Sequence, residues 1–130
     1  MVIDTSAIIA ILTDAPERLR LIDALETSER NLLSAVTYYE ALLVMRAKKG
    51  SQGAELVDEL VADLGATIVS FDKSQAASAY LAYDEYGKGR SPARLNLGDC
   101  ASFALAHLTG EPLLFKGSDF AATGVAAVSY

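Results

Sequence analysis

The sequence has few of the residues that build disulfides or zinc sites. It contains one cysteine and one histidine among 130 residues. A single cysteine excludes an internal disulfide, and one cysteine with one histidine is too few for a zinc cluster. No apolar run approaches the ~20 residues of a membrane helix, and the N-terminus lacks a basic leader with a signal cleavage site. We therefore expect one domain over residues 1–130, with no membrane segment, in the reducing cytoplasm.

Positive charge is also scarce. The chain has 11 Lys and Arg against 17 Asp and Glu, a net charge of −6, which taken alone argues against a nucleic-acid partner. The basic residues are unevenly placed, however. The stretch 86–98, "YGKGRSPARLNLG", carries Lys88, Arg90 and Arg94 and no acid. These side chains form either a solvated loop or a phosphate-binding surface.

Short apolar runs alternate with helical patterns along the chain. This alternation predicts a mostly parallel sheet covered on both faces, with ligands at the carboxyl ends of its strands. The expected strands are 2–4, "RNLLSA", "ATIVSF", "PLLF" and "VAAVS". The expected helix starts are Ser6, Asp14, Ser34 or Thr37, Ser51, Asp72 and Asn96. Two expected buried stripes are Ala76, Ala77, Tyr80 and Leu81, and Leu97, Cys100, Ala101, Ala104, Leu105 and Leu108.

Four acidic residues fall where such a sheet would gather them. Asp4 ends the first strand, and Glu40 lies early in the helix that follows "NLLSA". Asp99 lies in the first turn of the helix near Asn96, and Asp119 follows "PLLFKGS". The apolar neighbours expected on the face of Glu40 are Val36, Leu43, Val44 and Ala47.

Each acid taken alone has a structural explanation. Asp4 could cap a helix, Asp119 could stabilise a turn, and Glu40 and Asp99 could complete capping boxes from Thr37 and Asn96. Together they repel one another, because two unit charges about 4 Å apart cost on the order of 4 kcal/mol at an effective dielectric of about 20. Relief requires protonation or a cation. Carboxylate oxygens without a His or Cys cluster suit Mg²⁺ or Mn²⁺.

Four motifs carry a family resemblance that spans essentially the whole chain. They are "VIDTSAII", "TYYEALLV", "LNLGDCASFALA" and "PLLFKGSDFAATGV". In sequence and spacing they resemble the PIN domain, and within it the VapC-type toxin ribonucleases of bacterial toxin–antitoxin pairs. The resemblance implies a three-layer α/β/α sandwich with a central, mostly parallel sheet of four or five strands.

The resemblance further implies an endoribonuclease that depends on Mg²⁺ or Mn²⁺. Asp4 and Asp99 would bind the ion directly, and Glu40 would bind it or orient the attacking water. Asp119 would bind a second ion or act through water. Two hydroxyl residues, Ser6 and, as the weaker candidate, Thr5, would orient Asp4 or the substrate phosphate.

Partners follow from the same resemblance. RNA phosphates would lie on four basic residues that flank the acids: Lys88, Arg90, Arg94 and Lys116. A cognate VapB-type antitoxin would cover the site. The toxin would form a homodimer, and a heterotetramer or larger assembly with the antitoxin.

Three other functions compete with this interpretation. A haloacid-dehalogenase-like phosphatase also begins with a strand-end aspartate, but it needs a second aspartate where this chain has Ser6. A receiver-like signalling domain needs a pair of early acids that is missing here. A non-catalytic PIN-fold module that only binds a partner stays possible, although the four intact acids argue against it.

Overall fold

The computed structural model describes residues 1–130. No helix in it combines the length and apolar character needed to cross a membrane. Ten helices and strands follow one another along the chain: β1 (Val2–Ile3), α1 (Thr5–Leu12), α2 (Arg18–Glu26), β2 (Leu32–Ser34), α3 (Ala35–Lys49), α4 (Gln52–Asp63), β3 (Thr67–Val69), α5 (Lys73–Tyr86), α6 (Leu97–Thr109) and β4 (Leu113–Leu114).

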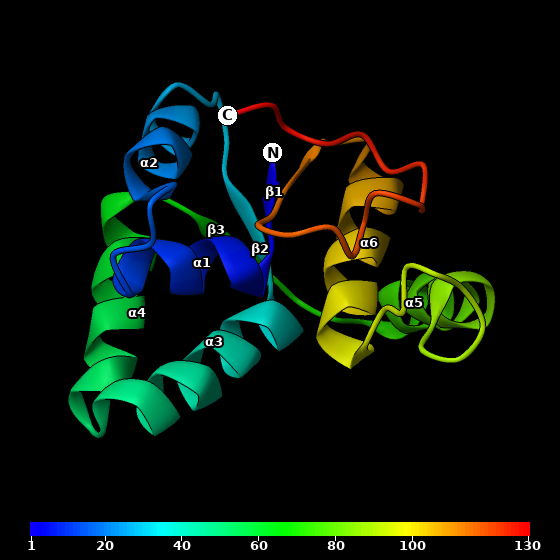
Figure 1. The fold of residues 1–130 in the computed structure, drawn as a ribbon, viewed down its shortest axis with the longest axis horizontal. Helices are drawn as coiled ribbons and strands as arrows, with labels where there is room; N and C mark the ends of the chain where they lie inside the picture. The colour runs from blue at the N-terminus through cyan, green and yellow to red at the C-terminus, as the bar shows by residue number, and fades with distance from the viewer.

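The four strands form one parallel sheet in the order β3-β2-β1-β4. In Figure 1, helices α1, α2 and α4 lie on one side of the sheet and α5 and α6 on the other. The prediction of a three-layer α/β/α sandwich is therefore confirmed, with four strands. The expected last strand, "VAAVS", is wrong as a strand, because only Ala127 pairs there, through a single bridge to Leu113.

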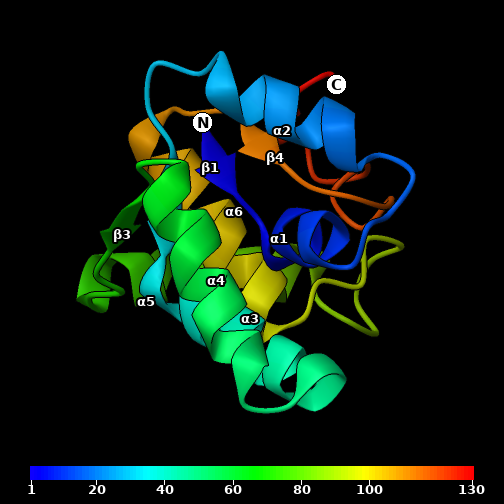
Figure 2. The ribbon, with the colours of Figure 1, turned by 90° about the vertical axis from the view of Figure 1, so that its left-hand side faces the viewer.

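The core consists of two apolar clusters, one on each face of the sheet. Val2 and Leu32 point into the cluster under α5 and α6, whereas Ile3 and Leu33 point into the cluster under α1 to α4. Successive strand residues face opposite sides, so an apolar pair fills both clusters. Strands β1, β2 and β4 are buried throughout, whereas β3 at the edge of the sheet is largely exposed. Figures 1 and 2 show the helices packed around the sheet.

Side-chain caps set several helix starts where the sequence predicts them. Asp72 Oδ1 accepts a hydrogen bond from Gln75 N at the start of α5, and Ser34 Oγ accepts one from Val36 N at the start of α3. The expectation for Asp14 is wrong, since α2 begins at Arg18 and Asp14 has a positive φ of 54° in the preceding turn.

The expected buried stripe on α5 is also wrong. Tyr80 and Leu81 are exposed, and the buried face consists of Gln75, Ala79 and Ala82. This face packs against α6, whose contact side is itself rich in alanine. Small residues allow the two helices to approach closely, so the larger apolar side chains of α5 face outward.

Candidate active site

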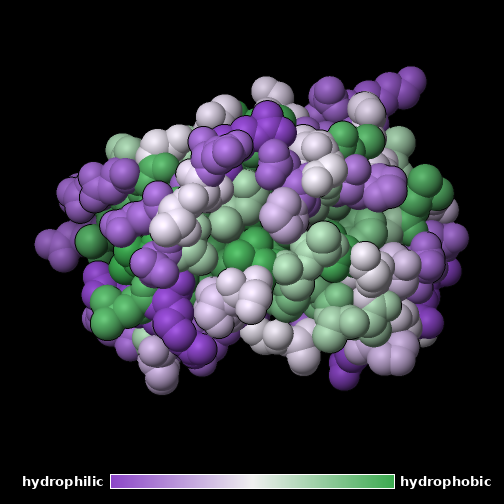
Figure 3. Space-filling view, turned by 90° about the horizontal axis from the view of Figure 1, so that it is seen from above, coloured by the Kyte–Doolittle hydropathy of each residue, from purple (hydrophilic) through white to green (hydrophobic).

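Three helices begin at one edge of the sheet, where the strands end. Helix α1 starts one residue after β1, and α3 starts directly after β2. The first turn of α6 lies at the same edge, with the loop that follows β4 close by (Figure 1). The opposite end holds both termini (Figure 1), and Figure 3 shows its surface as hydrophilic groups around an apolar centre. The carboxyl ends of parallel strands are where such folds bind ligands.

Asp4 is the most deeply buried acid at this edge, with 2% of its surface exposed. It caps α1, because Oδ2 accepts hydrogen bonds from Ser6 N at 2.9 Å and from Ser6 Oγ at 2.7 Å. Its second oxygen, Oδ1, is buried without a hydrogen-bond partner. An ionised oxygen buried in this way costs several kcal/mol unless it is neutralised, as a cation would do.

Ser6 connects Asp4 to the loop after β4. Its hydroxyl donates to Asp4 Oδ2 and accepts a hydrogen bond from Lys116 N at 2.9 Å. The Lys116 side chain turns elsewhere, with Nζ 3.1 Å from an oxygen of Glu17. Ser6 therefore fixes both the rotamer of Asp4 and the backbone that leads to Asp119.

Glu40 reaches the same edge from α3. Thr5 Oγ1 donates a hydrogen bond to Glu40 Oε2. The half-buried carboxylate lies against Gly98, the second residue of α6. Thr5, which directly follows Asp4, thus contacts Glu40 and makes no hydrogen bond to Asp4.

The structure excludes the alternative explanation of Glu40 and corrects one expectation about its helix. Its helix is capped by Ser34, so no capping box runs from Thr37, whose hydroxyl lies 3.0 Å from Ser102 Oγ in the core. The expected apolar stripe around Glu40 is only partly buried, since Leu43 is 52% exposed. The buried positions of α3 are Thr37, Ala41 and Met45.

Asp99 lies in the first turn of α6 and has two roles. It completes a capping box, in which Asp99 Oδ2 accepts from Asn96 N at 2.8 Å and Asn96 Oδ1 accepts from Asp99 N at 2.9 Å. The pKa of Asp99 is raised from 3.8 to about 6, chiefly by burial, with further contributions from the negative charges of Asp4, Asp119 and Glu40. The three other acids therefore lie within electrostatic reach of Asp99.

Asp119 is the most exposed of the four. It lies in the turn after β4, between Ser118 and the buried Phe120. Only its charge, felt at Asp99, connects it to the other acids. The structure thus brings Asp4, Glu40 and Asp99 to one edge through direct contacts of their own segments, and brings Asp119 there through its loop.

The oxygen donors suit a hard divalent cation, although they do not form a closed cage. No three His, Cys, Asp or Glu side chains are close enough together to hold a metal ion as they stand. Mg²⁺ keeps several waters and is usually bound by one or two carboxylates, so a complete protein cage is not required. The unpartnered Asp4 Oδ1 fits such an ion, and so does the pKa of Asp99, which is raised by burial and further by the nearby negative charges.

The basic residues lie on exposed segments between α5 and α6 and after β4. Arg90 pairs with Asp84 at 2.8 Å, and Lys116 pairs with Glu17. Lys88 and Arg94 are exposed and make no salt bridge. Arg94 has a positive φ of 56° and lies two residues before Asn96, the residue that caps α6.

Cys100 and His107 do not add a nucleophile or base to the site. Cys100 is buried, and burial raises the pKa of its thiol to about 11, with a further contribution from the charge of Asp99. A thiol with so high a pKa is protonated near neutral pH and reacts poorly. His107 lies at the far end of α6, stacked on Phe103 with ring centroids 6.0 Å apart.

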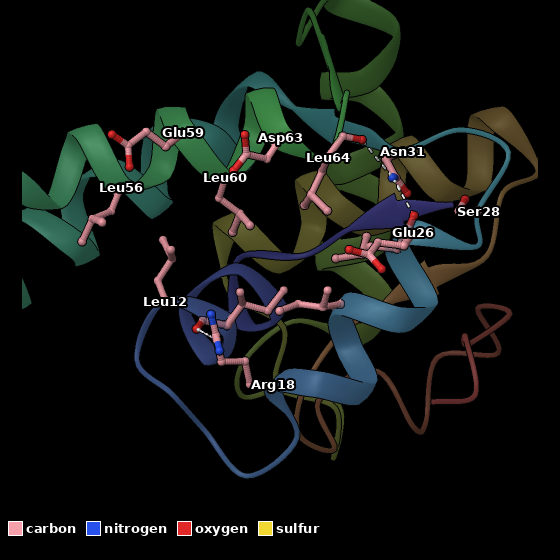
Figure 4. A pocket seen from close by; sticks show the side chains of 13 residues that line it. Leu12, Arg18, Glu26, Ser28, Asn31, Leu56, Glu59, Leu60, Asp63 and Leu64 are labelled. Carbon is pink, nitrogen blue, oxygen red and sulfur yellow. Dashed lines mark hydrogen bonds between the residues drawn. The ribbon is translucent and has the colours of Figure 1, made fainter.

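A separate groove of about 550 Å³ lies between α1–α2 and α4, away from the four acids (Figure 4). Seven of its 13 lining residues are hydrophobic, and two of its polar side chains hold backbone carbonyls. Asn31 Nδ2 donates to the carbonyls of Leu25 and Leu64, and Arg18 Nε donates to the carbonyl of Ile11. No group of reactive side chains converges there, so the groove is not a second candidate active site.

Sequence reasoning did not identify Gly98 or the contact of Thr5 with Glu40. A buried glycine inside an otherwise strong helical segment, "LNLGDCASFALA", is a local signal that could have pointed to Gly98. The Thr5 contact joins residues 35 positions apart and has no local signal.

Comparison with known proteins agrees with this architecture. The PIN domain family model matches residues 1–126. A Ribonuclease VapC of Mycolicibacterium smegmatis is 45% identical over 128 residues, covering 98% of this chain and 99% of the relative. Among solved structures, VapC20 of Mycobacterium tuberculosis, described as a sarcin-ricin loop cleaving toxin, superposes with a TM-score of 0.78 at 15% identity, covering 99% and 98% of the two chains. A toxin-antitoxin complex from Klebsiella pneumoniae gives a TM-score of 0.74 at 21% identity, covering 99% and 97%. The chain therefore belongs to the PIN-domain family, in the group of proteins named VapC.

Proposed function

We propose that this protein is a VapC-type toxin endoribonuclease, acting as one domain over residues 1–130 and using Mg²⁺ or Mn²⁺. The observation that carries the proposal is the buried, unpartnered Asp4 Oδ1, at an edge where burial, and then the negative charges of Asp4, Asp119 and Glu40, raise the pKa of Asp99. The names of close relatives support RNA as the substrate. Family membership removes the haloacid-dehalogenase-like and receiver-like alternatives.

A bound divalent ion would supply a Lewis acid for the scissile phosphate and a water of lowered pKa. In this proposal Asp4 Oδ1 and Asp99 hold the ion, and Asp119 assists from the loop after β4. Ser6 holds Asp4 in one rotamer through its two hydrogen bonds to Oδ2. Glu40, held by Thr5, binds the ion or orients the attacking water. Without an ion, this acidic edge would repel the phosphodiester.

The RNA backbone would approach from the loop between α5 and α6. Lys88 and Arg94 are exposed and make no salt bridge, so both side chains would be free to bind RNA phosphates. Arg90 and Lys116 would first have to leave Asp84 and Glu17. Contacts of this kind bind phosphates without reading sequence.

A VapB-type antitoxin is the proposed inhibitor. The proposed state of the toxin is a homodimer, which forms a heterotetramer or a larger assembly with the antitoxin. The similar fold in a toxin-antitoxin complex supports the partner. Exposed apolar side chains beside Glu40 support a protein interface there: Leu97, which is 76% exposed, Leu43 and Tyr39. Light scattering tests the assembly, and a strictly monomeric toxin would contradict the homodimer.

Cleavage of RNA by the purified toxin tests the proposed function. We expect cleavage with Mg²⁺ or Mn²⁺, none with chelator, and none by the Asp4→Asn variant. Asp72→Asn is the matched control, because Asp72 also caps a helix but at the start of α5. Tight protein binding without any cleavage would favour the non-catalytic module.

A further inference from the structure

The carboxylate of Glu40 is confined between two residues on different helices. On one side, Thr5 at the start of α1 donates its hydroxyl hydrogen to Oε2. On the other side lies Gly98 in the first turn of α6. A methyl group at position 98 would lie 2.2 Å from Oε2, 2.6 Å from Cδ and 2.7 Å from Oε1. Only a residue without a side chain leaves room for the carboxylate in this position.

The backbone does not explain the glycine at position 98. Its φ is outside the left-handed region that favours glycine, in contrast to Gly110, which ends the same helix with φ +70°. Glycine also has a lower helix propensity than alanine, although Gly98 lies in the first turn and not in the helix interior. The good helix formers Leu and Ala recur along the rest of α6. The remaining reason for glycine at this position is the space that it leaves for Glu40.

We propose that Gly98 and Thr5 are positioning residues that clamp Glu40 in its active orientation. Each is the chain neighbour of a proposed metal ligand, since Thr5 follows Asp4 and Gly98 precedes Asp99. The clamp therefore ties the third acid, from α3, to the segments that carry the other two. The contacts stand on the structure alone, whereas their role in catalysis rests on the proposed function.

The clamp predicts a characteristic dependence of stability on Glu40. Gly98→Ala changes Tm less favourably in the otherwise unchanged protein than in a Glu40→Ala background, because the methyl group displaces the carboxylate and breaks its hydrogen bond with Thr5. In a Glu40→Ala background the obstruction is gone. There Gly98→Ala raises Tm by about 2–4 °C through better helix propensity.

Gly53→Ala is the matched control. Gly53 is also a buried helical glycine, but a methyl group there would meet the backbone oxygen of Met45 at 2.2 Å. Its effect on Tm is therefore the same with and without Glu40. An equal effect of Gly98→Ala in both backgrounds overturns the clamp. If Gly98→Ala alone fails to fold, folding of the double variant supports the clamp and failure of both overturns it.

Kinetics test the positioning role. Gly98→Ala and Thr5→Val lower kcat for RNA cleavage by about 10- to 100-fold, with KM little changed, because displaced catalytic groups cost rate and not RNA binding. Thr5→Ser keeps the hydroxyl and retains most of the rate. A variant Gly98→Ala with unchanged kcat overturns positioning while the nuclease function stands. A wild-type protein that cleaves no RNA overturns the function, and the Tm measurements still decide the clamp.

Discussion

Replacing Asp99 by asparagine should stabilise the metal-free protein at neutral pH. Asparagine has nearly the same shape, and its side-chain oxygen can accept the same hydrogen bond from Asn96 N. The capping box is therefore kept while one negative charge is removed. Because the pKa of Asp99 is raised in the folded state, the folded protein holds this proton more tightly than the unfolded chain does. The stability cost of Asp99 is thus absent below about pH 3.8, grows as pH rises from there, and is fully present above about pH 6.

The size of the effect follows from the pKa. A rise from 3.8 to about 6 is roughly two units, or about 3 kcal/mol at most. Asp99 is only partly buried, so solvent screening reduces this to about 1–2 kcal/mol. We expect the Asp99→Asn variant to gain that amount in unfolding free energy at pH 8, and to lose the gain below about pH 4.

Thermal or urea unfolding in chelator between pH 4 and pH 8 measures this difference. Asp72→Asn is the control, because Asp72 caps α5 by accepting a hydrogen bond from Gln75 N. In a second arm, added Mn²⁺ should raise Tm of the wild type more than that of the Asp99→Asn variant. A variant that is less stable than wild type at pH 8, or equally stabilised by Mn²⁺, would refute the proposed electrostatic role of Asp99.

Three further changes test other contacts. Ser6→Ala removes the hydroxyl that binds Asp4 Oδ2 and should weaken Mn²⁺ binding about 10- to 100-fold by calorimetry; unchanged affinity would show that Asp4 needs no such support. Arg94→Ala should raise KM for RNA and reduce the salt slope of binding by about 1, whereas an unaltered slope would place RNA elsewhere. Thr37→Val leaves Ser102 Oγ without its buried partner and should cost about 1–3 kcal/mol in urea unfolding, most of it regained on adding Ser102→Ala; a neutral single variant would contradict this.

Local rules predicted the parts of the fold that local chemistry controls. Asp72 and Asn96 cap their helices as their sequence context indicates, and Ser34 is one of the two starts considered for α3. The alternation of apolar runs with helices predicted the parallel sheet, because three of its four strands, β1, β2 and β4, are buried. Asp4 was likewise placed correctly at the end of β1.

Tertiary packing decided what the sequence pattern could not. Periodicity assigned the large side chains Tyr80 and Leu97 to the core. In the structure α5 and α6 contact each other through alanines, and these two large side chains are exposed. The contact of Thr5 with Glu40 depends on how α1 and α3 meet, which no local pattern encodes. Gly98 carried a local signal, yet its meaning required knowing which side chain lies against it.

Diffraction from crystals grown with Mn²⁺ tests the central claim most directly. We expect one strong anomalous peak beside Asp4 Oδ1 and within coordination distance of an Asp99 oxygen, lost in crystals of the Asp4→Asn variant. A peak remote from Asp4, or carboxylates turned apart with no ion among them, would contradict it.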